Sequence, residues 1–304
     1  MIKEVLEKTD ALEEKIQALL AEEEKTEEIK VLQEEKKKLL DSCKDLEPGD
    51  RVFLARHPRR PHVEDFVSAL FTDFFEQKGD HLYDEDRSIY GGIARFHGRP
   101  VTVLGHRKGR TVEENLSCNF GMTCPEGYRK AKRLMEQAEK FDRPIITFVD
   151  TPGAYPGLEA EQHGQGEAIA KNLAFMSSLH VPVIAVVTGE GSSGGALGIC
   201  VANKILMLEN AIYSVLSPEG FATILWKDSS RAAEAAKVMK LTAKDLKEAN
   251  VADEVVPESL GGAQDDPESL YKALDQVLEK TLAYYDGMSR HEIRKDRLSK
   301  FRNI

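Results

Sequence analysis

The sequence predicts an α/β fold built on a largely parallel sheet. Residues 144–150 and 181–188 are runs rich in aliphatic side chains, which is typical of strands buried on both faces of such a sheet. A helical pattern at residues 164–179 lies between them, and a glycine-rich segment follows each run. Strand, loop and helix thus alternate along the chain, as they do in parallel α/β sheets. Ligands of open sheets bind at the carboxyl ends of the strands, so these two segments are the first candidates for a site.

The composition limits the classes of protein to be considered. At 304 residues the chain has room for one large domain with appendages or for two modest domains. Its formal net charge of -10 argues against a general nucleic-acid-binding protein. No apolar run approaches the roughly 20 residues of a membrane span, and the charged first residues do not resemble a signal peptide, so we expect a cytoplasmic protein.

The cysteines give no sign of a metal site. The chain has four, Cys43, Cys118, Cys124 and Cys200, and none belongs to a C-x-x-C pair of the kind that binds zinc. We therefore expect reduced thiols and no metal in this chain.

Residues 3–44 predict a helical arm. They are rich in Glu and Lys, contain neither Pro nor Gly, and carry a narrow apolar seam at helical spacing. The phase of the seam slips at residues 25–28, so either two helices, the second capped by Thr26, or one bent helix fits the pattern. The seam would pack on the core or on a partner subunit, and a solvated arm without a specific role is the alternative.

The segment between the arm and the first buried strand divides into shorter elements. Residues 46–50 predict a break in the chain, and residues 62–77 predict a helix. Residues 90–96 and 100–105 predict two strands joined by a hairpin-like turn.

Start signals indicate several helices. Thr123 and Glu126 have the spacing of a capping box, for a helix that runs to residue 141. After residue 196 we expect strands at 204–208, 212–215 and 251–256, helices that begin near Ser217 and Thr242, and a charged helical tail at 267–302.

Residues 189–196, directly after the second apolar run, match two motifs. Read from Gly189, they fit the dinucleotide fingerprint G-x-G-x-x-G, and Glu209 stands 20 residues later, where an acid would bind a ribose. Read from Gly191, they fit the nucleophile elbow G-x-S-x-G, with Ser193 as the nucleophile.

Each motif lacks its expected surroundings. A serine nucleophile needs a histidine base, and the only histidine after Ser193 is His291, in the charged tail. A dinucleotide site needs a long helix after the glycines. Here the helix that follows Gly195 is short, because Asn203 and Lys204 interrupt it. A third interpretation requires only backbone N–H groups, which can hold a phosphate or an oxyanion. A purely structural turn is the alternative to that interpretation.

Five segments resemble one known family. They are residues 119–122, 125–131, 144–157, 189–196 and 213–227. Together they resemble the carboxyltransferase α subunit of the multisubunit, bacterial type of acetyl-CoA carboxylase. The resemblance extends over nearly the whole chain, from the helical arm to residues 260–263, so it does not rest on one short motif.

The resemblance implies a crotonase-like fold, a spiral ββα core between helical arms. We accordingly divide the chain into an N-terminal helical arm (1–47), a carboxyltransferase core (48–258) and a C-terminal helical tail (259–304). The implied reaction transfers the carboxyl group of carboxybiotin to acetyl-CoA and forms malonyl-CoA, the first committed step of fatty acid biosynthesis.

The resemblance also implies partners. The family assembles as α2β2, and its β subunit has the same fold and usually carries the zinc ribbon. The co-substrate carboxybiotin is attached to the biotin carboxyl carrier protein, and a separate biotin carboxylase component uses ATP, for which this chain shows no P-loop. The chain would then be inactive without its β subunit.

By resemblance, the site consists of backbone groups. The N–H groups of Gly194 and Gly195, with Ala196 as a further contributor, would stabilise the oxyanion on the ureido oxygen of biotin. The second oxyanion hole, for the thioester enolate, would lie on the β subunit. The residues expected beside biotin are Gly153, Ala154, Tyr155, Gly191 and Ser193; for the loop at 151–157, a rigid structural role is the alternative.

A basic loop follows the predicted hairpin. Its side chains Arg107, Lys108 and Arg110 are candidates for contacts with the phosphates of CoA at the subunit interface, and a solvated basic loop is the alternative. Two functions from other classes also stay open: a crotonase-type hydrolase or isomerase that acts alone on an acyl-CoA, and a dinucleotide-binding protein.

Overall fold

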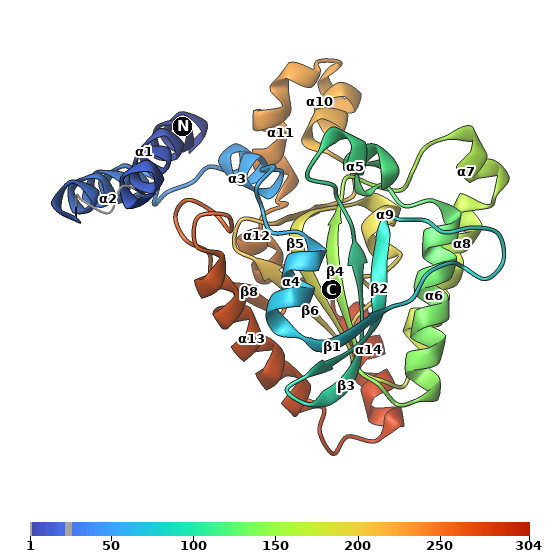
Figure 1. Cartoon of the computed structure of the whole chain (residues 1–304). Coiled ribbons are helices and arrows are strands. Elements are labelled where there is room, and N and C mark those ends of the chain that lie inside the picture. The colour runs from blue at the N-terminus through green and yellow to red at the C-terminus, as the bar shows by residue number, and fades with distance from the viewer. Residues whose placement is uncertain (1, 22–25) are drawn as a thin grey trace.

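One mixed sheet forms the centre of the molecule (Figure 1). The computed structural model describes residues 2–21 and 26–304, and within them eight strands form a sheet in the order β1-β2-β3-β4-β5-β6-β8, with β7 paired to β5. The pairs β1–β2 and β2–β3 are antiparallel, and all later pairs are parallel. The strands are β1 (Thr72–Glu76), β2 (Ile89–Phe96), β3 (Arg99–His106), β4 (Ile145–Thr151), β5 (Val183–Ser192), β6 (Lys204–Leu208), β7 (Ile212–Ser214) and β8 (Glu254–Val256).

Helices cover both faces of the sheet. α6 and α8 pack together on one face, and α4 and α13 pack together on the other (Figure 1). None of the helices in the described part of the chain is long and apolar enough to cross a membrane. The helices are α1 (Ile2–Ala21), α2 (Thr26–Asp41), α3 (Pro48–Ala55), α4 (Val63–Leu70), α5 (Val112–Ser117), α6 (Pro125–Lys140), α7 (Leu158–Gln162), α8 (Gln165–Ser178), α9 (Ser193–Leu197), α10 (Pro218–Trp226), α11 (Ala232–Met239), α12 (Ala243–Glu248), α13 (Pro267–Tyr284) and α14 (Arg290–Arg302).

The two predicted buried strands are neighbours in the sheet. β4 and β5 pair in parallel, with Ile145 opposite Val183, and every residue of both strands is buried. Burial on both faces explains why their sequences are continuously apolar instead of alternating. β2 and β3 form the expected antiparallel hairpin. The prediction of an α/β fold is therefore confirmed, and the four cysteines are free thiols, as expected.

The N-terminal arm consists of two helices, which was one of the two predicted alternatives. α1 and α2 pack against each other, and their apolar seam also meets the body of the protein (Figure 1). Ile2, Leu6 and Leu40 form a buried cluster with Leu54 of α3. The chain itself therefore covers part of the seam. The side chain of the expected cap, Thr26, lies outside the described residues, and the division of the chain at residues 47 and 258 stays a prediction.

The helix predicted at residues 62–77 is shorter than expected. α4 ends at Leu70 and the chain continues as the edge strand β1, so the prediction is wrong beyond that residue. β1 can approach β2 because Gly92 has no side chain: a Cβ there would lie 2.0 Å from the carbonyl oxygen of Phe75. Phe74 packs on Tyr90, with ring centroids 4.9 Å apart, instead of lying on a helix face.

The capping box predicted at Thr123 is wrong as well. The N-cap of α6 is Cys124, which makes no side-chain capping bond. The helix starts with Pro125, whose missing N–H is tolerated in the first turn. Thr123 is buried instead, and its hydroxyl accepts a hydrogen bond from Ser88 at 3.0 Å.

Other start signals are confirmed. Ser217 and Thr242 cap α10 and α12, and each side chain accepts a backbone N–H from the first turn of its helix. Residues 46–50, expected only as a break, contain the start of α3, because Pro48 occupies its first turn.

A buried arginine joins the C-terminal helix α14 to the start of β5. Arg297 is fully buried, and its guanidinium donates hydrogen bonds to the carbonyls of Met176, Leu179 and Val181 at 3.0, 2.6 and 2.7 Å, and to the side chain of Asn203. Carbonyls at the end of a helix have no partners within that helix, so α8 is completed by a side chain from far along the sequence. Burial lowers the pKa of Arg297 to about 10, which leaves it charged at neutral pH.

We expect Arg297→Leu to lower the free energy of unfolding by about 3 kcal/mol, because several buried carbonyls would lose their donors. Urea unfolding of the purified chain measures this change. Arg302→Leu, at an exposed position near the end of α14, is the control and should change the stability by less than about 0.5 kcal/mol. If both variants unfolded at the same urea concentration as the parent chain, Arg297 would not have this role.

Candidate active site at the carboxyl ends of two strands

The glycine-rich segment is partly a strand. β5 continues through Ser192, and its last residues pair with β7 on one side while Gly191 pairs with Thr151 of β4 on the other. A purely structural turn, one of the interpretations of residues 189–196, is therefore excluded for the first half of the segment. The first two glycines of the dinucleotide fingerprint lie in this strand, so they do not form the tight turn that the motif requires.

The two glycine-rich segments touch each other at Gly195. A Cβ on Gly195 would lie 2.5 Å from the carbonyl carbon of Gly153 and 2.6 Å from the nitrogen of Ala154. A Cβ on Gly194 would be in ordinary contact, 3.6 Å from Ile169. Of these two glycines, Gly195 is therefore the one that the close approach of the two backbones requires. The predicted site residues of both segments come together here.

The remaining residues expected beside biotin lie around this contact. Gly191 faces the ring of Tyr213, which a Cβ would approach to 2.9 Å. Ala154 forms an isolated parallel bridge with Thr123, and the next residue, Tyr155, donates its N–H to the Thr123 carbonyl at 3.0 Å. Gly153 has a φ of 149°, and a Cβ there would meet open space. The loop is thus held by its backbone while one side of Gly153 stays open.

Ser193 does not have the surroundings of a nucleophile. It is exposed, has a left-handed backbone with φ 56°, and begins the short helix α9. His291, the only histidine that follows it in the sequence, lies on α14 beside Arg290, which pairs with Glu139 and Asp142 near the amino end of β4. Ser193 lies at the opposite end of the sheet, so His291 cannot be its base.

Lys108 connects the basic loop to the ends of β4 and β5. Its Nζ donates to Oδ1 of Asp150 at 2.5 Å, and the same oxygen accepts the N–H of Glu190 at 2.9 Å. Gly189 makes room for this carboxylate, because a Cβ there would lie 2.4 Å from Oδ1. Lys108 is therefore held at the candidate site and is not part of a solvated loop.

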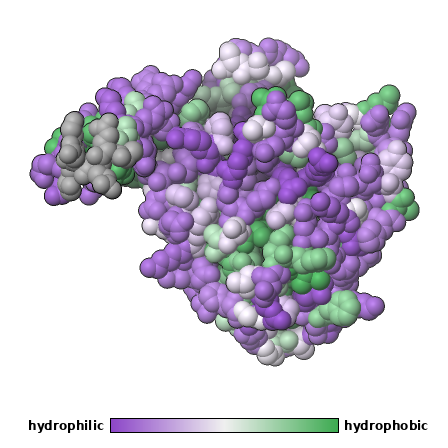
Figure 2. Space-filling model, viewed as in Figure 1, coloured by the Kyte–Doolittle hydropathy of each residue, from purple (hydrophilic) through white to green (hydrophobic). Residues whose placement is uncertain are grey.

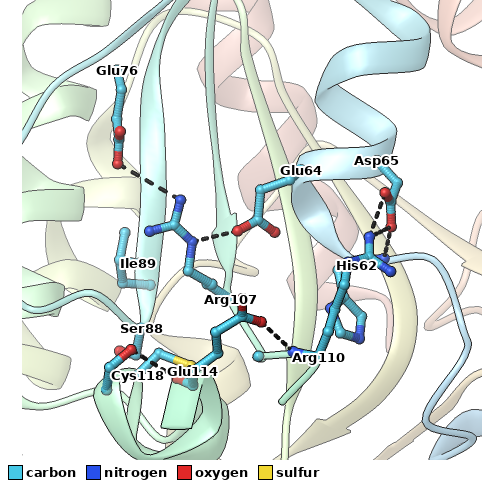
Figure 3. A network of polar contacts seen from close by, with 12 residues as sticks. His62, Glu64, Asp65, Glu76, Ser88, Ile89, Arg107, Arg110, Glu114 and Cys118 are labelled. Atoms are coloured by element: carbon cyan, nitrogen blue, oxygen red, sulfur yellow. Dashed lines mark hydrogen bonds and ion pairs between the residues drawn. The ribbon is translucent and has the colours of Figure 1, made fainter.

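The two arginines of the basic loop are also paired with acids (Figure 3). Nε of Arg107 donates to Glu64 at 2.5 Å, and its guanidinium lies 4.3 Å from the ring centre of Tyr90. Arg110 binds both carboxylate oxygens of Asp65, at 2.5 and 2.6 Å. These side chains and Lys108 line a cavity of about 830 Å³. Both acidic and basic side chains line the cavity. An anion bound there would therefore compete with the carboxylates for the basic side chains.

Two buried residues that the sequence did not indicate lie near the carboxyl ends of β3 and β5. The hydroxyl of Tyr128, on α6, donates to the Gly195 carbonyl at 3.3 Å. His106 ends β3, and its Nδ1 accepts the N–H of Asp150 at 3.4 Å. Burial lowers the pKa of His106 to about 4, so its ring is neutral at pH 7. For His106, the one signal available in the sequence was its position at the end of a strand, adjacent to the strand end that carries Asp150.

One group of side chains in residues 2–21 and 26–304 has the spacing of metal ligands. It consists of His97, in the turn between β2 and β3, and Asp275 and Glu279 of α13. His97 already binds Asp275, at 2.8 Å. This turn lies at the amino end of β3, so the group is remote from the glycine segments.

Solved structures define the class of fold. The transcarboxylase 12S structure with bound methylmalonyl-coenzyme A matches with a TM-score of 0.57 at 21% identity, over 71% of this chain and 41% of that one. A Pseudomonas malonate decarboxylase hetero-tetramer in complex with coenzyme A matches with a TM-score of 0.57 at 17% identity, over 69% of this chain and 84% of that one. The chain thus has the crotonase-like fold of the carboxyltransferases.

Sequence comparison identifies the family within this class. The family model described as "Acetyl co-enzyme A carboxylase carboxyltransferase-like" matches residues 2–304. The acetyl-coenzyme A carboxylase carboxyl transferase subunit alpha of Bacillus cereus is 52% identical over 280 residues, which cover 92% of this chain and 86% of that protein. The subunit of the same name from Anoxybacillus flavithermus is 54% identical over 259 residues, 85% of this chain and 80% of that protein. The chain belongs to the family of acetyl-CoA carboxylase carboxyltransferase α subunits.

We expect Gly195→Ala to destabilise the chain by about 2 kcal/mol, because the new methyl group would force the backbones of the two segments apart. Gly194→Ala is the matched control, since its methyl group has room, and should change the free energy of unfolding by less than about 1 kcal/mol. Urea unfolding compares the two variants. Equal losses would show that the contact between Gly195 and Gly153 is not tight.

Proposed function

We propose that this chain supplies the biotin half of a carboxyltransferase active site and works together with a β subunit. The observation that carries the proposal is the contact of Gly195 with Gly153 and Ala154 at the carboxyl ends of β4 and β5. It presents backbone groups from two strand ends next to each other, and the side of Gly153 is open. Backbone N–H groups held in this way can stabilise an oxyanion without a catalytic side chain.

In the proposed mechanism the N–H groups of Gly194 and Gly195, with Ala196 as a further donor, bind the ureido oxygen of biotin. Carboxybiotin, when bound, would release CO2, and its anionic ureido group would take the proton from the methyl group of acetyl-CoA. The enolate formed in this way would then bond to the CO2 and give malonyl-CoA. Donors that are already in place stabilise the charge on the ureido oxygen without reorganisation, and removal of one such donor typically raises the barrier by about 2.7–4 kcal/mol. Ser193 has no role as a nucleophile in this scheme.

A β subunit would complete the site. Apolar side chains are exposed near the carboxyl ends of the strands: Val112 and Leu116 on α5 are 67% and 61% exposed, and Ile224 and Leu225 on α10 are 68% and 56% exposed. Figure 2 shows the small hydrophobic patch over α5 among hydrophilic side chains. Exposed apolar groups of this kind favour a protein interface. The hole for the thioester enolate, and a zinc ribbon, would then belong to the β subunit.

The basic loop is a candidate for the phosphates of CoA. Arg107, Lys108 and Arg110 line one cavity, which supports the proposal. Each of them already binds a carboxylate, so a phosphate would have to displace an acid such as Asp65 from the partly exposed Arg110.

We expect the purified chain alone to be inactive and to gain biotin-dependent carboxyl exchange between malonyl-CoA and acetyl-CoA when a β subunit of the family is added. The reason is that only one of the two oxyanion holes lies on this chain. A radioactive exchange assay with and without the β subunit measures the gain, and titration with NAD is the control, which should show no binding. Rapid turnover of an acyl-CoA by the chain alone would instead indicate a hydrolase or isomerase.

We expect Ser193→Ala to reduce the exchange rate of the assembled enzyme less than about tenfold, because only backbone groups act on the oxyanion. The same exchange assay measures the rate, with thermal unfolding as a check that the variant is folded. A loss of more than about a thousandfold would be the size expected for removal of a nucleophile and would revive that interpretation.

A further inference from the structure

The helix that carries the proposed backbone donors is too short to pair its own carbonyls. α9 comprises five residues, Ser193–Leu197, and the buried Gly195 lies at its centre. In a longer α-helix the Gly195 carbonyl would accept the N–H of Ile199, but that N–H donates to the Ala196 carbonyl instead, at 3.2 Å. A buried carbonyl that lacks its helical donor requires another one.

The hydroxyl of Tyr128, on α6, supplies that donor. Tyr128 is fully buried, and its hydroxyl donates to the Gly195 carbonyl at 3.3 Å. Gly198 leaves space for the ring, because a Cβ at that position would lie 2.5 Å from Cε1 of Tyr128. The ring of Tyr128 thus fits against the backbone just beyond α9, and its hydroxyl reaches one particular carbonyl.

The backbone of Tyr128 is held as well. Asn172 is a buried residue of α8, and its side-chain amide donates to the Tyr128 carbonyl and to the Gly198 carbonyl, each at 3.0 Å. One amide group therefore joins α6 and α8 to the segment that follows β5. Because both the ring and the backbone of Tyr128 are restrained, its hydroxyl occupies a fixed position relative to this segment.

Gly195 is a residue whose conformation depends on such contacts. It has no side chain, so rotation about its φ and ψ is restricted mainly by what its backbone touches. The packing on Gly153 and Ala154 limits this rotation, and the hydrogen bond from Tyr128 fixes the direction of the Gly195 carbonyl. Rotation about the same two angles would turn the Gly195 N–H, which is one of the proposed donors.

We propose that Tyr128 is a positioning residue, whose hydroxyl holds the Gly195 carbonyl and thereby fixes the direction of the N–H groups of Gly194 and Gly195. The inference rests on the proposed function of those N–H groups. Tyr128 is fully buried, so it acts through the backbone of Gly195 and not on the substrate. Donors that are held in place stabilise a developing charge better than donors that must reorganise. Loss of the hydroxyl should therefore slow the chemical step and leave the binding of CoA substrates unaffected.

Two variants that each delete one buried hydroxyl test this role. Tyr128→Phe keeps the ring and removes the donor on the Gly195 carbonyl. Thr147→Val, on β4, removes a hydroxyl that donates at 2.8 Å to the carbonyl of Ile199, which lies beyond the proposed donors. In the enzyme assembled with its β subunit, we expect Tyr128→Phe to lower kcat of carboxyl exchange about 10- to 50-fold, with KM for malonyl-CoA within about twofold. We expect Thr147→Val to leave both kcat and KM within about twofold of the parent.

Thermal unfolding of the two variants separates positioning from folding. Each variant loses one hydrogen bond between a buried hydroxyl and a backbone carbonyl, so we expect both melting temperatures to fall by about 2–4 °C. A purely structural role of Tyr128 would make the two variants alike in kcat as well. If Tyr128→Phe failed to assemble, Gly198→Ala would replace it, because the new methyl group would displace the ring of Tyr128. We expect that variant to lower kcat about tenfold or more with an unchanged KM.

Three results would overturn the inference. They are an unchanged kcat in the assembled Tyr128→Phe enzyme, or in Gly198→Ala where that variant is used; an equal loss of kcat in Thr147→Val; and a change confined to KM. Absence of exchange in the parent enzyme would overturn the proposed function as well, so the two failures are distinguishable.

Discussion

The organisation of this molecule depends on the close approach of two backbone segments at the carboxyl ends of β4 and β5. The parallel pairing of these strands brings their ends to the same edge of the sheet, and the lack of a side chain on Gly195 allows contact with Gly153 and Ala154. A single methyl group at this point would occupy the space of the neighbouring backbone. The contact therefore requires both the register of the central strands and one particular glycine.

Buried polar groups keep this edge of the sheet in place. Asp150 accepts hydrogen bonds from Lys108 and from the backbone of Glu190, and it donates its own N–H to His106. At the other end of β5, Arg297 binds the carbonyls that precede the strand. Buried charges are tolerated only where they are hydrogen-bonded or paired, so these contacts restrict how the strand ends can move. A site made of backbone N–H groups needs such restriction, because its effect depends on donors that do not reorganise during the reaction.

The charged residues of the basic loop show how structure changes the meaning of a sequence pattern. In the sequence, Arg107, Lys108 and Arg110 form a cluster of positive charge without visible partners. In the structure each of them meets an acid: Glu64 and Asp65 come from α4, and Asp150 comes from β4. The cavity that they line is consequently of mixed charge. A phosphate that entered this cavity would have to exchange with a carboxylate, because the cavity is not purely basic.

The sequence by itself determined the α/β class, the neighbouring buried strands and the family, because continuous apolar runs, start signals such as Ser217 and long contiguous motifs are local properties of the chain. It did not reveal that residues 72–76 form a strand, since their pairing depends on Gly92 of β2, nor that Gly189 and Gly191 lie within β5, since β7 and Thr151 extend that strand. Likewise, Tyr128 acquires its position behind Gly195 only when α6 is packed against the segment that follows β5. Contacts between residues far apart in the sequence have no local signature, and it was the tertiary structure alone that decided them.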